Sequence, residues 1–182
     1  MMDKDESILI RRILDGHSED YSYFIGRYAD SVTALVAQLV TSREDAEELV
    51  QDAFINGFNH LGSFLGNASF HTWISRIAYR CALSHLRRRR IKYVEIDERT
   101  PVNEADVDEA MADSRRTEQL QRAITLLKPD EKTLIKLYYY DNFPIKDIAY
   151  IMGTEPGTVA TRLHRIRKKL YLIIVNDNGN DI

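Results

Sequence analysis

Residues 143–170 read FPIKDIAYIMGTEPGTVATRLHRIRKKL, and this stretch decides the fold because two helical periodicities meet at a glycine. Apolar residues recur at spacings of three and four over 145–152, which is typical of a short amphipathic helix. Gly153 permits a tight turn, Thr154 is a suitable N-cap for a second helix, and Pro156 is tolerated in the first turn of that helix. We therefore interpret the stretch as a helix-turn-helix unit.

The second helix of this unit separates an apolar face from a polar one. Apolar residues stand at spacings of four, three and four and so share the inward face: Val159, Leu163, Ile166 and Leu170. The polar side chains left on outward or flanking faces are Thr158, Thr161, Arg162, His164, Arg165 and Lys169. In a helix-turn-helix the second helix enters the major groove, where such side chains meet base edges and phosphates. Because no acid stands among the five bases from Gly157 to Leu170, DNA binding is favoured over a solvated hairpin whose bases only complement the helix dipole.

The first half of the chain also has helical apolar spacing. We predict helices over about 8–14, 24–39, 46–58 and 70–93. Gly16 suits the left-handed turn after the first of them. Ser18, Ser42 and Ser69 are the expected N-caps of the other three. Asp45 follows Ser42 in an arrangement similar to a capping box.

The fourth of these helices has a strongly basic end. It reads LRRRRIKY at 86–93, and from Arg76 to Tyr93 the chain has seven bases and no acid. Four successive arginines sweep most of the way round a helix at about 100° per residue, so they cannot all lie on one solvated face. A polar and aromatic loop precedes the helix, and a cationic track beside stacking rings is a combination that binds unpaired strands. The alternative is a basic helix end that only improves solubility.

The third predicted helix is acidic where the fourth is basic. Residues 42–54 read SREDAEELVQDAF, and such a run is usually a solvated helix face. In a protein that binds nucleic acid elsewhere, acids keep DNA away from the face that they occupy. We therefore interpret this helix as a surface for a protein partner.

Charge and periodicity divide the chain into parts. From Val94 to Glu118 nine acids stand against three arginines, helical periodicity is lost at first, and Pro101 interrupts the segment. Too little apolar surface is present before residue 114 to offset the entropy cost of ordering. The predicted fold is all-α, with two small helical domains and an acidic flexible linker between them. The four-helix domain covers 1–93, the linker 94–113, the helix-turn-helix domain 114–175 and the tail 176–182.

Composition excludes several other classes of protein. Hydrophobic residues make up 44 % and charged residues 29 % of the chain, as in soluble globular proteins. The longest apolar run, ALVAQLV at 34–40, is far shorter than the roughly 20 residues that span a bilayer. The acidic start of the chain is also unlike a secretory signal peptide. We expect a cytoplasmic protein without membrane insertion.

The sequence predicts no catalytic or metal site. Cys81 is the single cysteine, which excludes an internal disulfide and a cysteine-based zinc site. The five histidines form no H-E-x-x-H or E-x-x-H pair, and there is no G-K-S/T phosphate loop. We expect no enzymatic activity, no cofactor, no bound metal and no small-molecule substrate.

The order of these segments resembles bacterial RNA polymerase sigma factors of the extracytoplasmic-function (ECF) type. The resemblance extends from about Ile8 to Leu170 and is carried by DAEELVQDAF, SFHTWISRIAY, the basic helix end, the acidic linker and GTVATRLHRIRKKL. It implies a region 2 domain, a region 4 domain and the function of a transcription initiation factor. Such a factor binds core RNA polymerase, directs it to −10 and −35 promoter elements, assists promoter melting and is held by an anti-sigma factor.

The resemblance also implies three groups of contact residues. The polymerase contacts on the acidic helix are Glu47, Glu48, Gln51 and Asp52. The −10 contacts are Asn67, Ser69, Phe70, Trp73, Arg76, Arg80, Ser84, Arg87, Arg88, Arg89 and Arg90. A flipped base would lodge in the loop around 67–70, since extruding a base costs a few kcal/mol and needs a pocket to offset it. The −35 contacts are Thr158, Thr161, Arg162, His164, Arg165 and Lys169.

Three positions depart from the family pattern. Pro144 stands where a capping Ser or Thr is common, Ala160 where a base is common, and Arg80 where Asn is frequent. We therefore expect a different start to the helix-turn-helix, one DNA contact fewer and a different −10 preference. The competing interpretation is a helix-turn-helix regulator whose N-terminal bundle senses or dimerises. The acidic and basic helices argue against it, because a sensory bundle needs no nucleic-acid surface of its own.

Overall fold

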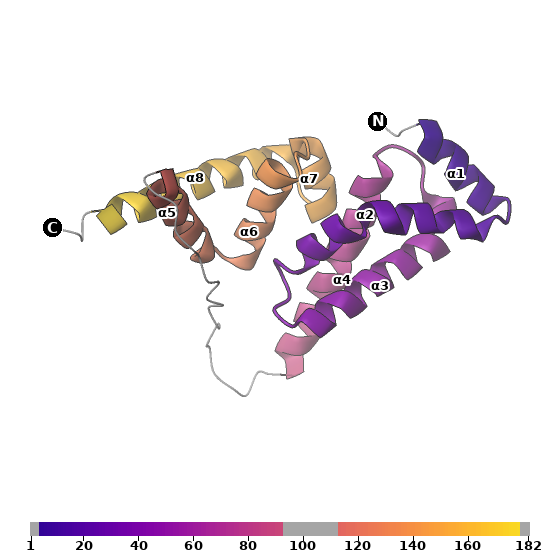
Figure 1. The fold of residues 1–182 in the computed structure, drawn as a ribbon, viewed down its shortest axis with the longest axis horizontal. Coiled ribbons are helices and arrows are strands. Elements are labelled where there is room, and N and C mark those ends of the chain that lie inside the picture. Colours follow the sequence, from indigo (N-terminus) through magenta and orange to yellow (C-terminus); the bar gives the residue numbers. More distant parts are fainter. Residues whose placement is uncertain (1–3, 93–112, 179–182) are drawn as a thin grey trace.

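The computed structural model describes residues 4–92 and 113–178, and every regular element in them is helical (Figure 1). The helices are α1 (Lys4–Leu14), α2 (Tyr21–Val36), α3 (Arg43–Asn59), α4 (Phe70–Lys92), α5 (Asp113–Thr125), α6 (Pro129–Ile135), α7 (Ile145–Met152) and α8 (Pro156–Asn178). Short 3-10 turns stand at η1 (Ser18–Asp20) and η2 (Leu61–Ser63), and a π-type turn, η3 (Lys136–Tyr140), continues α6. The predicted all-α class is confirmed.

The predicted linker lies outside the described residues except at its last position, Asp113, which opens α5. At the other end, α8 continues to Asn178, beyond the predicted domain limit at residue 175. The domain limits themselves stay a prediction.

The N-terminal half is a bundle in which α2, α3 and α4 pack against one another and α1 covers one end. Its centre is aromatic, because the rings of Phe24 and Phe70 lie 4.1 Å apart and both side chains are fully buried. Helix α3 comes very close to its neighbours at Gly57. A Cβ atom there would stand 2.7 Å from the Tyr21 hydroxyl and 2.8 Å from Cδ1 of Ile74. The absence of a side chain at this position therefore sets how closely α3 lies against α2 and α4.

Two of the predicted N-caps are confirmed. The backbone N–H of Asp45 donates to the Ser42 hydroxyl over 3.1 Å, at the start of α3. The backbone N–H of Thr72 donates to the Ser69 hydroxyl over the same distance, at the start of α4. Each serine thus satisfies one of the N–H groups that a helix leaves free in its first turn.

Two other predicted N-caps are wrong. Ser18 opens the 3-10 turn η1, and α2 follows directly behind Asp20, whose φ of −63° and ψ of −17° are already helical. A turn that runs straight into a helix has no extended cap residue, so a serine there has nothing to cap. Thr154 is one residue too early, because α8 begins at Pro156 and the first helical N–H groups bond to the carbonyl of Glu155.

The C-terminal half contains the predicted helix-turn-helix as α7 and α8. Gly153 ends α7 in the left-handed conformation, with φ +66° and ψ +41°, which confirms the tight turn. Pro144 precedes α7 in an extended conformation and provides no side-chain cap, as its departure from the family pattern predicts. The core of this half consists of fully buried side chains from α6 to α8: Leu134, Leu137, Ile148, Ile151 and Leu163.

The two halves touch through α4 and α7, which pack against each other (Figure 1). The sequence places these helices more than 50 residues apart and gives no pattern that pairs them. This contact positions the helix-turn-helix beside the helix with the basic end.

Candidate nucleic-acid interface

Helix α8 has the two faces that its sequence predicts. Val159, Leu163 and Ile166 are 0, 1 and 2 % exposed, so the inward stripe is confirmed. The opposite side carries four of the predicted −35 contacts as exposed residues: Thr158, Thr161, His164 and Arg165. Because these four follow one another within two helical turns, they form one polar surface that a DNA groove can approach.

The other two predicted −35 contacts lie on a flank of α8 and pair with acids of α6. Nη2 of Arg162 stands 2.5 Å from a carboxylate oxygen of Asp130, and Nζ of Lys169 stands 2.7 Å from Glu131. Burial alone would raise the pKa of Glu131, but hydrogen bonds from Lys169 and from the backbone of Lys128 lower it. These pairs hold α8 against α6, and both Arg162 and Lys169 therefore have partners within the protein.

The basic helix α4 lines a small pocket on one of its faces. Side chains from α4 form one wall, and side chains from the end of α3 and from η2 form the other, around a volume of about 420 Å³. Four of the predicted −10 contacts belong to this lining: Trp73, Arg80, Ser84 and Arg88. The opposite wall contains Leu49, Asp52 and Asn56 of α3 and His60 directly behind it. The sequence analysis missed Asn56 and His60, because nothing in the sequence pairs them with a helix that starts at Phe70.

The cationic part of α4 reaches past the bundle. Arg87, Arg88 and Arg89 are exposed, while the side chain of Arg90 lies outside the described residues. Asp45 of α3 stands 3.5 Å from Arg89. With Arg89 about half exposed, this pair leaves the cationic end open to solvent.

The aromatic residues at the start of α4 are more buried than a stacking surface requires. Phe70 is 0 % and Trp73 9 % exposed, and the ring of Phe64 lies 5.1 Å from that of Trp73. In this conformation Phe70 offers no free ring face, so a direct contact with a base would require it to leave the core. Asn67 is exposed in the loop, and Ser69 is occupied as the N-cap of α4.

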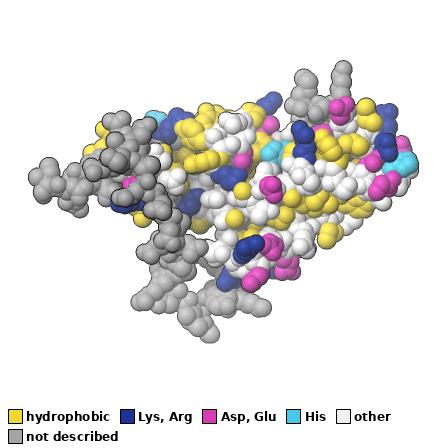
Figure 2. Space-filling model, viewed as in Figure 1, with side chains coloured by type: hydrophobic (Ala, Val, Ile, Leu, Met, Phe, Trp, Pro, Cys, Tyr) yellow, Lys and Arg dark blue, Asp and Glu magenta, His cyan; other side chains and the backbone are white. Residues whose placement is uncertain are grey.

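The acidic helix α3 presents its predicted partner contacts as one exposed surface. Glu47, Glu48, Gln51 and Asp52 all lie on the solvent side, and Glu47 pairs with Arg43 over 2.9 Å. The next turn adds an apolar residue that the sequence analysis missed, since Ile55 is 57 % exposed. The sequence could have indicated this residue, because Ile55 stands four residues after Gln51 and residues four apart share one face of a helix. Figure 2 shows exposed hydrophobic side chains over the N-terminal half with charged side chains beside them.

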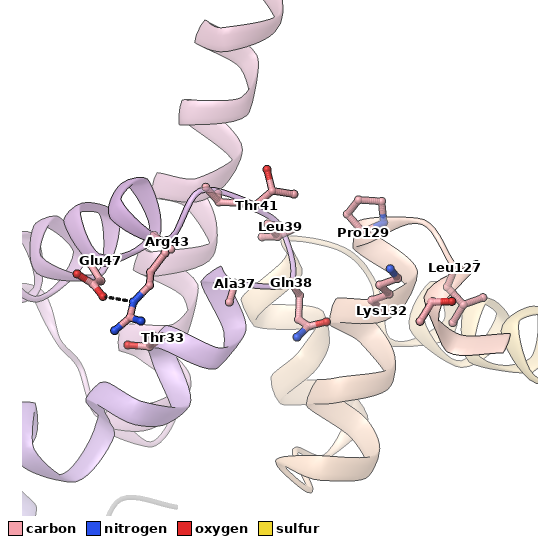
Figure 3. A pocket seen from close by; sticks show the side chains of 13 residues that line it. Thr33, Ala37, Gln38, Leu39, Thr41, Arg43, Glu47, Leu127, Pro129 and Lys132 are labelled. Atoms are coloured by element: carbon pink, nitrogen blue, oxygen red, sulfur yellow. Dashed lines mark hydrogen bonds and ion pairs between the residues drawn. The ribbon is translucent and has the colours of Figure 1, made fainter. Parts of the chain in front are cut away.

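A second pocket is a groove lined by residues of both halves. Its volume is about 860 Å³, and Figure 3 shows Gln38, Arg43 and Glu47 on one wall and Leu127 and Lys132 on the other. The groove therefore places part of the acidic surface opposite the start of α6.

Neither a metal centre nor a membrane span is found among residues 4–92 and 113–178. The described side chains form no group of three or more potential metal ligands. None of the described helices combines the length and the apolar character needed to cross a bilayer.

Comparisons with known proteins find family matches in both helical halves. Sigma-70 region 2 matches residues 24–91, and sigma-70 region 4 matches residues 117–170. The chain is 30 % identical over 176 residues to the ECF RNA polymerase sigma-E factor of Haemophilus influenzae, covering 91 % of this chain and 93 % of that protein. It is likewise 30 % identical over 183 residues to the ECF RNA polymerase sigma-E factor of Escherichia coli K12, covering 91 and 92 %.

Two solved structures share the fold. The sigma factor RpoE from Bartonella quintana, crystallised with the anti-sigma factor NepR, aligns with a TM-score of 0.68 at 22 % identity, over 86 % of this chain and 97 % of that one. CnrH, in complex with the cytosolic domain of CnrY, aligns with a TM-score of 0.65 at 18 % identity, over 93 and 97 %.

A helical domain that matches region 2, followed by a helix-turn-helix domain that matches region 4, defines an RNA polymerase sigma factor of the sigma-70 type. Within that class the chain belongs to the ECF family, as its relatives over nearly their whole length establish. It is accordingly a transcription initiation factor, and the interpretation as a regulator with a sensory bundle is not favoured.

Proposed function

We propose that this chain binds core RNA polymerase through the exposed face of α3 and directs it to promoters with two separate DNA contacts, assisting their melting. The observation that carries this proposal is the division of charge among the exposed surfaces. One acidic helix face lies beside a basic helix with a pocket, and a second polar helix face belongs to the helix-turn-helix. Nucleic acid is attracted to the cationic surfaces and repelled by the acidic one, which leaves α3 for a protein partner.

The polymerase contacts on α3 are Glu47, Glu48, Gln51 and Asp52, with Ile55 as an apolar centre. An exposed apolar residue surrounded by polar ones is the usual anatomy of a protein interface. Reversing Glu48 and Asp52 to lysine is expected to weaken binding to core polymerase more than tenfold, an effect of about 1.4 kcal/mol or more. The control reverses Asp15 and Asp30, two exposed acids outside α3, which changes net charge equally. Equal loss in both double variants would argue against a local surface.

The −10 element is held by the α4 pocket and the arginine run in this proposal. No residue of the loop around 67–70, where the sequence analysis expects a flipped base, lines this pocket. We therefore propose that the flipped base enters beside Trp73 and Arg80, while the exposed arginines lie along phosphates. The supporting geometry is a pocket of about 420 Å³ whose lining combines Trp73 with polar side chains, such as Arg80, and apolar ones, such as Ile77. Asp52, also proposed as a polymerase contact, lies at the opposite wall. The loop carrying Asn67, Ser69 and Phe70 shapes the adjoining surface, and Arg76 and Ser84 complete the contact set.

The −35 element is read by Thr158, Thr161, His164 and Arg165, the exposed residues of α8. The cations Arg162 and Lys169 remain candidate contacts, with the added requirement that they leave Asp130 and Glu131. Arg165→Ala is expected to cost about 1 to 3 kcal/mol in −35 binding if the guanidinium contacts a base edge by two hydrogen bonds. Arg122→Ala on α5, an exposed arginine outside the helix-turn-helix, is the matched control. An equal effect of the two changes would contradict this assignment.

Run-off transcription with core polymerase and a promoter library is the decisive experiment. Initiation at a shared pair of promoter motifs only when the chain is added supports the proposal, and no promoter-dependent product would overturn it. We further propose a cytoplasmic site of action, inhibition by an anti-sigma factor, and no catalytic activity or cofactor requirement of the chain itself. Measurable turnover by the purified chain in the absence of polymerase would refute the last statement.

A further inference from the structure

The α4 pocket carries opposite charges on its two walls. Asp52 and Asn56 of α3 lie on one wall, and Arg80 and Arg88 of α4 lie on the other. All four residues are exposed, so their polar groups can be reached from solvent. The pocket therefore offers a charged hydrogen-bond acceptor on one side and charged donors on the other.

The charges across this pocket do not neutralise each other. No ion pair or hydrogen bond between described residues involves the Asp52 carboxylate or the Arg80 guanidinium. Facing charges do pair elsewhere in the chain, as between Lys136 and Asp141 over 2.7 Å. The pocket thus separates a carboxylate from a guanidinium, and a ligand with donors on one edge and acceptors on another can bridge the two.

Cys81 of α4 lies between the two walls. Nδ2 of Asn56 stands 3.8 Å from its sulfur atom, a contact that joins α3 to α4. Burial raises the pKa of the Cys81 thiol, and the contact with Asn56 lowers it. The charge of Asp52 raises this pKa further, while the charge of Arg88 lowers it. Asp52 and Arg88 therefore both act on the same point of the pocket.

This combination of groups fits a base better than a phosphate. The Asp52 carboxylate would repel a phosphate, whereas Trp73 and Ile77 provide apolar surface for the face of a ring. Guanine matches the polar groups best. Its N1–H and N2–H groups stand side by side and can donate to the two oxygens of one carboxylate, and its O6 and N7 accept two hydrogen bonds from one arginine.

The other three bases satisfy only part of the pocket. Adenine presents an acceptor, N1, where guanine has a donor, so a carboxylate facing that edge is left partly unpaired. Thymine has a single N–H donor, and cytosine donates only through its N4 amino group. A buried charged group that loses a hydrogen bond costs more than a neutral one does, which favours guanine over all three.

We propose that the α4 pocket selects guanine as the flipped base of the −10 element, with Arg80 donating to O6 and N7 and Asp52 accepting from N1–H and N2–H. Arg80 replaces the asparagine that is frequent at this position in the family pattern, and this exchange sets the preference of the present chain. The proposal rests on the proposed function, because it takes the pocket as the site of a flipped −10 base. Asp52 then has two roles, since it also belongs to the exposed face of α3.

A promoter library randomised over the −10 element tests the choice of base. Run-off transcription by core polymerase with the full chain is expected to select guanine at one −10 position by about tenfold or more. Arg80→Gln is expected to lose the preference at that position and to keep the preferences at the others. Arg87→Gln is expected to lower transcription of all library members alike, as for a phosphate contact. Arg11→Gln, at an exposed arginine of α1, is the matched control with unchanged preferences.

Base analogues test the assigned atoms in the unaltered protein. Deoxyinosine lacks the N2 amino group of guanine, and 7-deaza-deoxyguanosine lacks its N7 acceptor. Either analogue at the selected position is expected to weaken promoter binding by the holoenzyme about three- to tenfold, as for the loss of one hydrogen bond. Deoxyinosine is expected to bind like guanine in Asp52→Ala, and 7-deaza-deoxyguanosine like guanine in Arg80→Gln. Each comparison uses two DNAs on one holoenzyme, so any weaker binding of Asp52→Ala to core polymerase cancels.

These outcomes separate the possible failures. Promoters whose −10 elements show no selected guanine, or a selected cytosine in its place, would overturn the guanine assignment and leave the proposed function intact. A guanine preference that survives in Arg80→Gln, or analogues that bind the unaltered holoenzyme as well as guanine does, would also overturn the proposal. If no promoter-dependent product forms with any library member, the proposed function fails, and this inference fails with it.

Discussion

Substitution of Gly57 by alanine tests the packing that holds α3 against α2 and α4. The added Cβ would lie 2.7 Å from the Tyr21 hydroxyl and 2.8 Å from Cδ1 of Ile74, closer than real Cβ atoms stand to any neighbour. Such overpacking costs about 1 to 3 kcal/mol. Tyr21 cannot simply move away, since its hydroxyl donates to the Phe54 carbonyl over 2.9 Å, and an unsatisfied buried group costs about 1 to 3 kcal/mol.

The expected net effect of Gly57→Ala is a loss of about 1 to 3 kcal/mol in the free energy of unfolding. This net value includes a stabilisation of about 1 kcal/mol, because alanine has a higher helix propensity than glycine in a helix interior. Gly26→Ala in α2 is the matched control, because nothing lies within 4 Å of the Cβ at that exposed position and only the gain applies. Urea unfolding is followed through Trp73, the single tryptophan, whose ring lies 3.7 Å from the added atom. If Gly57→Ala is as stable as Gly26→Ala, the conclusion that α3 packs too closely for a side chain at Gly57 is refuted.

Two further predictions concern charged and titratable side chains. Arg162→Ala is expected to weaken −35 binding less than Arg165→Ala does, because Asp130 already occupies Arg162; band-shift titration of both variants measures this, and equal losses would refute it. Stability is expected to be constant above pH of about 6.5 and to fall below it, since burial lowers the pKa of His71 in the folded chain and the unfolded chain then binds the extra proton. Urea titration at several pH values measures this, and the fall is expected to be smaller in His71→Phe; an unchanged fall in that variant would assign it to other groups.

The environment of His71 explains why this histidine resists protonation. Its ring stacks on Tyr28 at 4.8 Å and contacts Phe143, while its Nε2 lies 2.7 Å from the Ser31 hydroxyl. Desolvation is the largest cause of the lowered pKa; Asp141 opposes it, and the cations Lys136 and Arg27 add to it. Asp141 is the one carboxylate among these causes, and it favours the charged form.

Local features of the fold were predictable from the sequence. The helix-turn-helix follows from an apolar period of about 3.6 residues on each side of Gly153, whose φ of +66° is rare for other residues. The caps Ser42 and Ser69 follow from short-range chemistry between a hydroxyl and an N–H three residues later. The errors at Ser18 and Thr154 have the same origin, because a hydroxyl near a helix start predicts a cap even where a 3-10 turn or a proline shifts the start.

Long-range features were not predictable, and the candidate site depends on them. The sequence places Arg162 on an outward or flanking face, but Asp130, which occupies it, stands 32 residues earlier on another helix. From the sequence, Phe70 could be either a core residue or a ring that stacks on a base. It belongs to the core because its ring packs against Phe24 of α2. Nor does apolar periodicity reveal that Thr72 is buried, because its partner belongs to the other domain.

The ion pairs within each domain explain how a chain of net charge −3 can present cationic surfaces that do not bind its own acidic surfaces tightly. On α8 the pairs of Arg162 and Lys169 engage acids of the same domain, so these acids do not attract α4. Three contacts join the domains. The Thr72 hydroxyl donates to the carboxylate of Asp147, and the guanidinium of Arg76 donates to the carbonyl of Tyr150. The rings of His71 and Phe143 also lie against each other. Contacts of this kind are individually worth about 1 kcal/mol, so their sum is small enough for a large polymerase interface to exceed it. A direct salt bridge between the arginine run and the acidic face of another domain would be harder to open than these contacts.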